Sequence, residues 1–98
     1  MYYTKLMVKS FLHRGIENFF RTGKTSDIQT NHAAKLRLIL TNLDAAEKPD
    51  DMDLPGLASH PLKGKRKNIW AVKINRNWRI TFRFSGRDTE LVNYEDYH

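Results

Sequence analysis

Apolar residues in the first part of the chain follow first an alternating and then a helical spacing. The segment from Lys5 to Leu12 alternates weakly and so predicts a strand, with Val8, Ser10 and Leu12 on one side. Between residues 14 and 23 the period becomes helical, and Gly23 is suited to the left-handed conformation that ends a helix. Three apolar side chains share one face of this predicted helix: Ile16, Phe19 and Phe20.

A second, longer helix is predicted between residues 28 and 49. Its apolar stripe follows the i, i+3, i+4, i+7 spacing that marks a core-facing side: Leu36, Ile39, Leu40 and Leu43. Ala33 extends this stripe, and Pro49 is expected to stop the helix because proline cannot continue it. Residues 49–64 are predicted to form a loop, since acids, two prolines and a glycine there resist regular structure.

The remaining residues predict an antiparallel sheet. Residues 69–74, 78–84 and 89–94 form extended runs that are joined by turn-forming sequences. Side chains of the middle run alternate between two faces, with Trp78, Ile80, Phe82 and Phe84 on one and Arg79, Thr81 and Arg83 on the other. We therefore predict an α+β domain with an N-terminal strand, two helices and a three- to four-strand antiparallel sheet, one of whose faces is core and the other cationic.

Length and composition exclude several classes of function. The 98 residues suffice for a single domain, 1–98, and 40% hydrophobic residues favour a folded chain. The sequence has no cysteine, which rules out disulfides, a thiol nucleophile and a cysteine zinc site. No apolar run approaches the length of a membrane span, and the first residues lack the apolar stretch of a signal peptide. We expect a cytoplasmic protein without membrane association.

The net charge of +6 is distributed unevenly. Every Lys, Arg, Asp or Glu between His60 and Arg87 is basic, whereas those after Arg87 are acidic. The basic stretch comprises Lys63, Lys65, Arg66, Lys67, Lys73, Arg76, Arg79, Arg83 and Arg87. Such a stretch indicates a phosphate-rich partner, and a solvated charged face is the alternative interpretation.

Five segments together resemble the HigB, or plasmid maintenance killer, family of RelE-like toxins. They are "MVKSF" at 7–11, "DLPG" at 53–56, "LASHPLKG" at 57–64, "NWRITFRF" at 77–84 and "NYEDYH" at 93–98. The likeness runs in order over residues 7–98, so residues 1–6 are expected to be an N-terminal extension, and Met7 is an alternative start.

This resemblance implies a fold, an activity and a partner. The fold would be that of the microbial RNase-like group, and the activity would be cleavage of messenger RNA in the ribosomal A site without a cofactor or metal. The partner would be a HigA-type antitoxin, a helix-turn-helix protein that inactivates the toxin. Together the two would bind operator DNA.

Metal-free RNA cleavage requires a base for the ribose 2′-hydroxyl, an acid for the 5′-oxygen and cations for the developing charge. Imidazole titrates near neutrality and suits the first two roles. A guanidinium on a strand suits the third, because it grips two phosphate oxygens at once. From chemistry and resemblance together, the predicted catalytic residues are His60, Lys63, Arg79, Asp96, Tyr97 and His98. Which of them is the base stays open.

Further residues are predicted to bind RNA or the ribosome: Lys65, Arg66, Lys67, Lys73, Arg76, Asn77 and Arg83. Of these, the run 65–67 is expected to be solvated and to contact ribosomal RNA without specificity. If the last strand pairs beside residues 78–84, it carries Asp96, Tyr97 and His98 to the sheet edge near the Arg79 face.

Four other residues are assigned no part in the chemistry. His13 and His32 are expected to lie at the surface, because they have no companions at metal-ligand spacing. Trp70 and Trp78 are expected in the core, since they alternate with core positions.

Two other classes of function stay open at this level. A toxin of the ParE type would inhibit DNA gyrase without hydrolysing anything, and a plain nucleic-acid-binding module would need only the basic stretch. Two histidines in family-matching segments favour the nuclease, because neither alternative requires paired proton-transfer groups.

Overall fold

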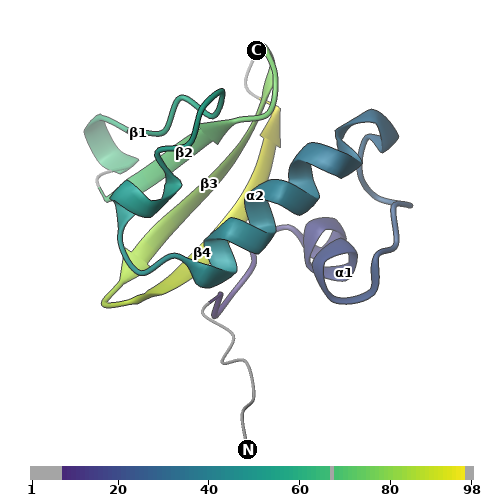
Figure 1. The fold of residues 1–98 in the computed structure, drawn as a ribbon, viewed down its shortest axis with the longest axis horizontal. Coiled ribbons are helices and arrows are strands. Elements are labelled where there is room, and N and C mark those ends of the chain that lie inside the picture. Colours follow the sequence, from purple (N-terminus) through teal and green to yellow (C-terminus); the bar gives the residue numbers. More distant parts are fainter. Residues whose placement is uncertain (1–7, 67, 97–98) are drawn as a thin grey trace, which may run out of the picture.

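The computed structural model describes residues 8–66 and 68–96, and it has two helices packed against one face of a four-stranded sheet (Figure 1). The helices are α1 (Arg14–Thr22) and α2 (Ala33–Ala45). The strands are β1 (His60–Pro61), β2 (Ile69–Lys73), β3 (Trp78–Ser85) and β4 (Asp88–Asp96), in the order β1-β2-β3-β4 with antiparallel neighbours. The predicted α+β class is confirmed. Among the described residues, no helix has the length and apolar character needed to cross a membrane.

Helix α1 forms where the spacing predicts it. The Nδ1 atom of His13 accepts a hydrogen bond from the backbone N–H of Ile16 at 3.1 Å and so caps the first turn. At the other end, Gly23 has a φ of 81° and donates its N–H to the carbonyl of Phe19. This left-handed position costs glycine little, because it has no Cβ. Ile16 and Phe19 are buried in the core.

Helix α2 supplies the predicted apolar stripe, and Leu36, Ile39, Leu40 and Leu43 are all buried. The helix is shorter than expected, since a 3-10 turn, η1 (Thr30–His32), precedes it and it ends at Ala45. Pro49 was expected to stop the helix, but α2 ends before it. Lys48 is extended, as residues before proline prefer to be, and Pro49 instead begins a second 3-10 turn, η2 (Pro49–Met52).

The predicted N-terminal strand is present as an extended segment alongside β4. Val8 and Phe11 form parallel bridges to Thr89 and Val92, and residues 5–7 lie outside the described part of the chain. The expected side-chain alternation is wrong. Val8 is buried and Phe11 packs against the core, whereas Leu12 is 62% exposed. The bridging residues are three positions apart, so a period of two cannot describe this segment.

Strand β1 lies within the region that was predicted as loop. It pairs with β2 through His60↔Ala71 and Pro61↔Trp70, and a 3-10 turn, η3 (Gly64–Arg66), follows it. Only two residues long, it has no detectable alternation. Proline is tolerated there because β1 is an edge strand.

The outer face of the sheet, which points away from α2, is not purely cationic as predicted. Strand β4 adds acids to it, because Glu95 pairs with Arg79 and Glu90 pairs with Arg83. A β-bulge makes this possible. Between those two pairs β4 has one residue more than β3, and Leu91 adopts a φ of 55° at that point.

The bulge is supported from the neighbouring segment, where the Ser10 hydroxyl accepts the Leu91 N–H at 2.9 Å. On the other face of the sheet, Trp70 and Trp78 pack against the core, which confirms that expectation.

Candidate active site

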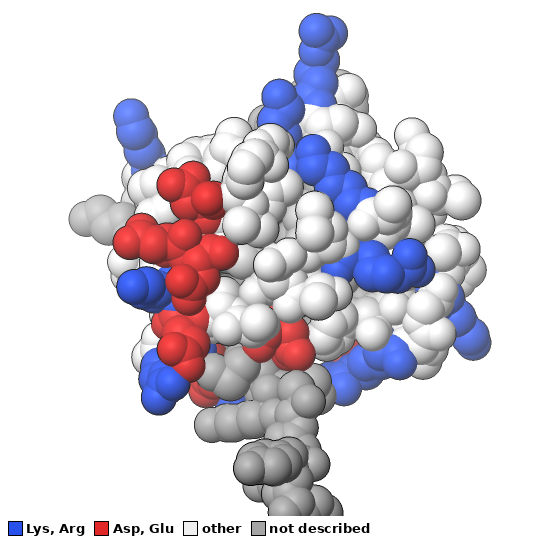
Figure 2. All heavy atoms as spheres, in the orientation of Figure 1, with Lys and Arg blue, Asp and Glu red and all other residues white. Residues whose placement is uncertain are grey.

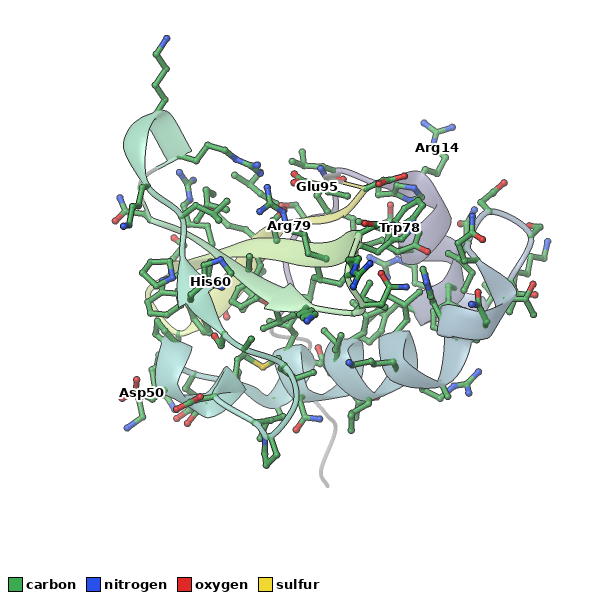
Figure 3. All side chains as sticks on the ribbon, turned by 90° about the horizontal axis from the view of Figure 1, so that it is seen from above. Arg14, Asp50, His60, Trp78, Arg79 and Glu95 are labelled. Atoms are coloured by element: carbon green, nitrogen blue, oxygen red, sulfur yellow. The ribbon has the colours of Figure 1, made fainter. Side chains whose placement is uncertain are left out.

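Acidic and basic side chains occupy different parts of the face covered by α2 (Figure 2). On the face covered by α2, acidic residues gather over η2 and the end of α2 (Figure 2). Glu47, Asp50, Asp51 and Asp53 are exposed there. Figure 3 shows Arg79 and Glu95 together on the side of the sheet away from α2. Because phosphate is attracted to cations, the outer face of the sheet is the better candidate for RNA.

Glu95 is the centre of a hydrogen-bonded cluster on this outer face. Arg66 binds both of its oxygens, at 3.2 Å to Oε1 and 2.7 Å to Oε2. Arg79 donates from Nε at 3.2 Å to Oε1, and its Nη2 lies 3.1 Å from the same oxygen. The Thr81 hydroxyl and the Asn93 amide donate to Oε2 at 3.3 and 3.1 Å. One carboxylate therefore joins η3, β3 and β4.

Electrostatics favour the ionised form of Glu95. Burial alone would raise its pKa, but hydrogen bonds and charge from Arg66, followed by bonds from Arg79 and Asn93, outweigh that effect. The pKa of Glu95 is therefore lowered from its ordinary value. The side chains of Arg79 and Glu95 are only 17% and 19% exposed. A guanidinium held in this way has little freedom to turn and is suited to orient a phosphate.

Sequence analysis missed Glu95. It lies in the "NYEDYH" segment, directly before Asp96, which was singled out instead. One signal was available, since pairing β4 beside β3 brings an acid opposite an arginine, as in the pair Arg79↔Glu95. The bulge concealed the pattern. Strict alternation assigns Glu90 and Glu95 to opposite faces, whereas the structure has both on the outer face.

His60 shares the outer face with Arg79 and Glu95. Directly paired residues in an antiparallel sheet point to the same side, and the row His60, Ala71, Thr81 and Asn93 crosses all four strands. His60 is exposed, and its Nδ1 lies 2.9 Å from the carbonyl oxygen of Ala58. Because a carbonyl only accepts, Nδ1 carries the proton, and Nε2 of the neutral ring is available to accept another.

The contacts of Arg66 differ from those predicted. It was predicted to belong to a solvated run with Lys65 and Lys67, but its ion pair with Glu95 holds η3 against the sheet. Lys65 is exposed as expected, and Lys67 lies outside the described residues.

The C-terminal candidates divide into described and undescribed residues. Asp96 pairs with Trp78, whose ring stacks on Tyr94 at 4.5 Å on the core side of the sheet. The register thus assigns Asp96 to the Trp78 side and not to the Arg79 side, contrary to the expected placement. Tyr97 and His98 lie outside the described residues, and the roles of all three stay predictions.

The other predicted site residues are spread along the same strands. Lys63 is exposed after β1, and Lys73 is exposed and pairs with Arg79. Arg76 and Asn77 lie in the turn between β2 and β3. Arg83 lies at the opposite end of β3 from Arg79 and forms an ion pair with Glu90. The structure thus brings only part of the predicted set together.

His32 is buried and not on the surface as expected, because it braces the turn that carries Arg76 and Asn77. The Oδ1 atom of Asn75 accepts the N–H groups of Asn77 and Trp78, at 2.9 and 3.0 Å. Its Nδ2 therefore faces Nε2 of His32 at 2.9 Å, while Nδ1 of His32 lies 2.6 Å from the Tyr94 hydroxyl. In this arrangement Nε2 accepts, so the ring is neutral and Nδ1 carries its proton.

Burial acts in the same direction on His32 and lowers the pKa of the imidazole. Burial also raises the pKa of the neighbouring Tyr94 hydroxyl, although the Gln29 N–H opposes this, and the charge of Asp96 raises it further. Both groups are therefore neutral near pH 7 and act as structural hydrogen-bonding partners.

The two helices on one face of a four-stranded antiparallel sheet agree with the fold expected from the resemblance to RelE-like toxins. Comparison with known sequences supports this class. The family model described as the RelE-like toxin of the type II toxin–antitoxin system HigB matches residues 9–98. The protein named Endoribonuclease HigB from Proteus vulgaris is 37% identical over 92 residues, which cover 94% of this chain and 100% of that relative. This chain belongs to the HigB-like toxin family.

Proposed function

We propose that this toxin is an endoribonuclease that cleaves messenger RNA in the ribosomal A site and thereby inhibits translation. The observation that carries this proposal is the clamped guanidinium of Arg79, which shares the outer sheet face with the imidazole of His60. A cation and a proton-transfer group on one face are what RNA cleavage through the 2′-hydroxyl requires. The endoribonuclease name of the Proteus vulgaris relative agrees with this assignment.

In the proposed reaction, the 2′-oxygen attacks the adjacent phosphorus while a base removes its proton. The bond to the 5′-oxygen breaks as an acid protonates that oxygen. Arg79, with Arg66 beside it, neutralises the charge that develops on the phosphate oxygens. Glu95 orients both arginines, so it acts as a positioning residue and not as a proton donor, because its lowered pKa keeps it ionised.

Two imidazoles are available for proton transfer. The tautomer of His60 leaves Nε2 able to accept a proton, which suits the role of base. His98 is the candidate acid by family resemblance. Asp96 would orient the His98 imidazole, and Tyr97 would stack on a base or form hydrogen bonds. Lys63 would add positive charge near the phosphate.

Membership in a toxin–antitoxin family implies an antitoxin partner. We propose that this antitoxin is of the HigA helix-turn-helix type, and that operator DNA is bound only through the complex. Ribosome contacts are assigned to exposed cations around the outer face, namely Lys65, Lys73, Arg76 and Arg83, and to the turn residue Asn77. Lys67 is assigned the same role from the sequence alone.

The test is cleavage of a defined messenger RNA by purified, untagged protein, with and without translating ribosomes, followed by mapping of the 5′ ends by primer extension. Codon-phased cuts that require ribosomes are expected from the wild-type protein. His98→Ala should remove them by lowering the rate by orders of magnitude while RNA binding changes little. His13→Ala is the control for loss of an imidazole, since His13 caps α1 and is assigned no part in the chemistry.

The other outcomes are equally clear. Cuts that appear without ribosomes would assign the protein to free RNases and contradict ribosome dependence. An absence of cuts under both conditions, with folded protein, would overturn the nuclease assignment and direct attention to gyrase or another non-hydrolytic target.

A further inference from the structure

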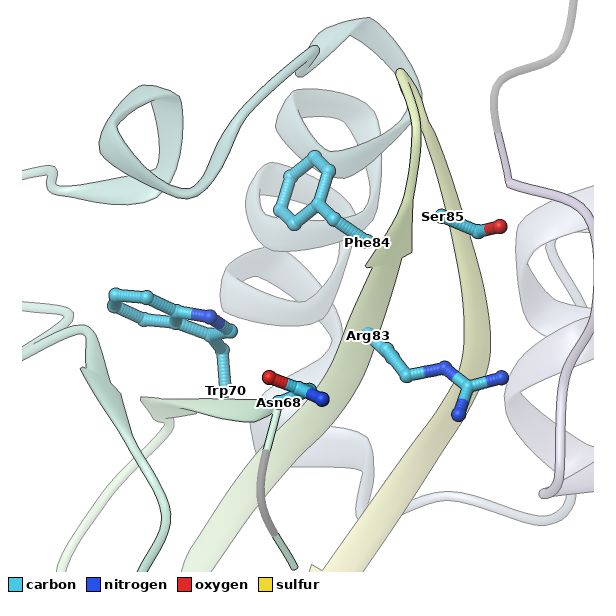
Figure 4. A pocket seen from close by; sticks show the side chains of 5 residues that line it. All are labelled: Asn68, Trp70, Arg83, Phe84 and Ser85. Atoms are coloured by element: carbon cyan, nitrogen blue, oxygen red, sulfur yellow. The ribbon is translucent and has the colours of Figure 1, made fainter.

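The turn between β2 and β3 contains an arginine that pairs with no other side chain in the described part of the protein. Arg76 is exposed, and within residues 8–66 and 68–96 it forms no hydrogen bond or ion pair. Arg79 and Arg83 of β3 differ from it, because each pairs with a glutamate of β4. Figure 4 shows the side chain of Arg83 extending toward β4. Within the described residues, the guanidinium of Arg76 is thus available to an external anion such as phosphate.

This turn lies at the end of the sheet that carries Arg79. The ladder between β2 and β3 ends at Lys73↔Arg79, and directly beyond it the N–H of Ile74 donates to the carbonyl of Trp78 at 3.0 Å. Arg76 is three residues from Arg79, a separation that a chain spans by at most about 11 Å. Because the turn projects past the ladder, a long side chain at its tip is not confined to one face of the sheet. An RNA strand whose scissile phosphate lies at Arg79 can therefore bring a neighbouring phosphate to Arg76.

The shape of the turn depends on the side chain of Asn75. Three-residue hairpin loops commonly end on a residue in the left-handed conformation, but none of the described residues 75–77 has a positive φ. The Oδ1 atom of Asn75 instead accepts the N–H groups of Asn77 and Trp78, at 2.9 and 3.0 Å. These two bonds close around Arg76, so its backbone conformation depends on Asn75.

Asn75 is in turn held from the helical layer. Its Nδ2 donates to Nε2 of His32 at 2.9 Å, and His32 is only 5% exposed at the end of η1. The hydroxyl of Tyr94 lies 2.6 Å from Nδ1 of the same ring and fixes its orientation. A second bond runs from Nζ of Lys35 on α2 to the carbonyl of Ile74 at 2.9 Å. Bonds from the helical layer thus reach two consecutive residues of the turn and restrict its movement.

We infer that Asn75 and His32 are positioning residues, which hold Arg76 so that it binds a phosphate of the messenger RNA beside the cleaved bond. The inference rests on the proposed function, because it requires RNA at the Arg79 end of the sheet. It narrows the general RNA or ribosome role of Arg76 to one contact. A guanidinium on a fixed turn loses less conformational entropy on binding than one on a free turn, so the network raises affinity. His32 is buried and acts only through Asn75.

The first test is the salt dependence of binding to a short single-stranded oligonucleotide with 2′-O-methyl groups, which lacks the attacking hydroxyl and cannot be cleaved. The slope of log affinity against log salt falls by about 0.7 for each single-strand phosphate contact that is lost. Arg76→Ala should show this fall and bind roughly tenfold more weakly. Asn75→Ala removes no charge, yet it should lower both the slope and the affinity, because Arg76 is no longer oriented. Fluorescence anisotropy of the labelled oligonucleotide measures both quantities.

A double-mutant cycle separates positioning from a merely structural role. In the Arg76→Ala background, Asn75→Ala should weaken binding by less than about twofold, because the side chain that Asn75 positions is gone. Lys73→Ala is the control, since it removes an exposed cation of β2 and its loss should add to that of Asn75→Ala. Thermal melting confirms that each variant folds. Wild-type affinity in Asn75→Ala, or an undiminished loss in the Arg76→Ala background, would overturn the inference.

His32 supplies a second pair of variants, which tests the network without changing the turn itself. His32→Leu removes the acceptor for Nδ2 of Asn75 and leaves the two bonds of Oδ1 in place. His32→Gln keeps an amide oxygen that can accept from Nδ2. His32→Leu should therefore bind the oligonucleotide several-fold more weakly than His32→Gln, and equal affinity in the two folded variants would exclude His32 as a positioning residue.

Failure of this inference is distinguishable from failure of the proposed function. Single-turnover cleavage of messenger RNA on ribosomes should require roughly tenfold more Asn75→Ala than wild type for half-maximal rate, with a maximal rate within about twofold. If wild type cleaves and Asn75→Ala matches it in both quantities, only this inference is wrong. If wild type neither binds nor cleaves RNA, the proposed function fails and the inference with it.

Discussion

Strands β3 and β4 contain two Arg–Glu pairs that look alike in register but differ in their surroundings. Arg79 pairs with Glu95 near one end of β3, and Arg83 pairs with Glu90 near the other. The first pair has side chains that are 17% and 19% exposed, and Glu95 also binds Arg66, Thr81 and Asn93. In the second pair the arginine is 45% exposed.

This difference separates a fixed guanidinium from an exchangeable one. Breaking an exposed ion pair costs little, so Arg83 can leave Glu90 for another anion. Removing one partner of a largely buried pair leaves a charge without compensation, so Arg79 stays in place. The proposed chemistry needs a cation in a defined orientation, which only the Arg79 end provides.

The largest expected effect comes from breaking the bulge that brings both acids to the arginine face. Leu91→Pro removes the N–H that Ser10 accepts and forces a negative φ where the chain has 55°. The free energy of unfolding should fall by about 3 kcal/mol or more. Urea denaturation measures it.

Leu91→Gly is the matched control for this prediction, because glycine accepts the positive φ and keeps the N–H. Its free energy of unfolding should stay within about 1 kcal/mol of wild type. Equal loss in the proline and glycine variants would show that the Leu91 side chain, and not the bulge conformation, stabilises this region.

Neutralising Glu95 and Glu90 in turn should lower the free energy of unfolding by different amounts. Glu95→Gln leaves two arginines without their shared anion and should lower the free energy of unfolding by about 1–3 kcal/mol. Glu90→Gln affects one exposed arginine and should cost at most about 1 kcal/mol. Chemical denaturation of the two variants at pH 7 compares them. A larger loss in Glu90→Gln would contradict the assignment of Glu95 as the structural centre.

The free energy of unfolding should also depend on pH, because the pKa values of Glu95 and His32 are shifted in the folded state. The pKa of Glu95 is lowered in the folded state, so the unfolded state binds more protons and stability falls as pH drops below the ordinary value of about 4.5. The pKa of His32 is also lowered, which makes stability begin to fall below about 6.5. Thermal melting across this range should show both effects in wild type.

Single variants assign each effect to its residue. Glu95→Gln should flatten the fall below pH 4.5, and His32→Gln should flatten the fall that begins below 6.5. A curve in His32→Gln that matches wild type would exclude His32 as the source of the effect at higher pH.

Much of the fold follows from local patterns, and the fold class was predictable for that reason. The apolar stripe of α2 and the strict alternation of β3 each reflect burial on one face, which a single sequence records. Strand β1 was not predictable, because its two residues are held by pairing with Ala71 and Trp70 and not by any pattern of their own.

The candidate site was only partly predictable. Arg79 and His60 carry recognisable chemistry, and the register assigns both to one face. Glu95 and the placement of Asp96 depend on where β4 shifts register, and one extra residue at Leu91 reverses the assignment of every later side chain. Arg66 reaches the site through a 3-10 turn whose position follows from tertiary packing. Such information is not contained in alternation or charge.

The most direct test of the account is the cleavage rate of Arg79→Ala beside that of Arg83→Ala, measured under single-turnover conditions on messenger RNA bound to ribosomes. We predict that Arg79→Ala loses roughly a hundredfold or more in rate, while Arg83→Ala loses only a few fold. Equal losses in the two variants, with both proteins folded, would contradict the claim that the clamped arginine at the Glu95 end of β3 marks the site of RNA cleavage.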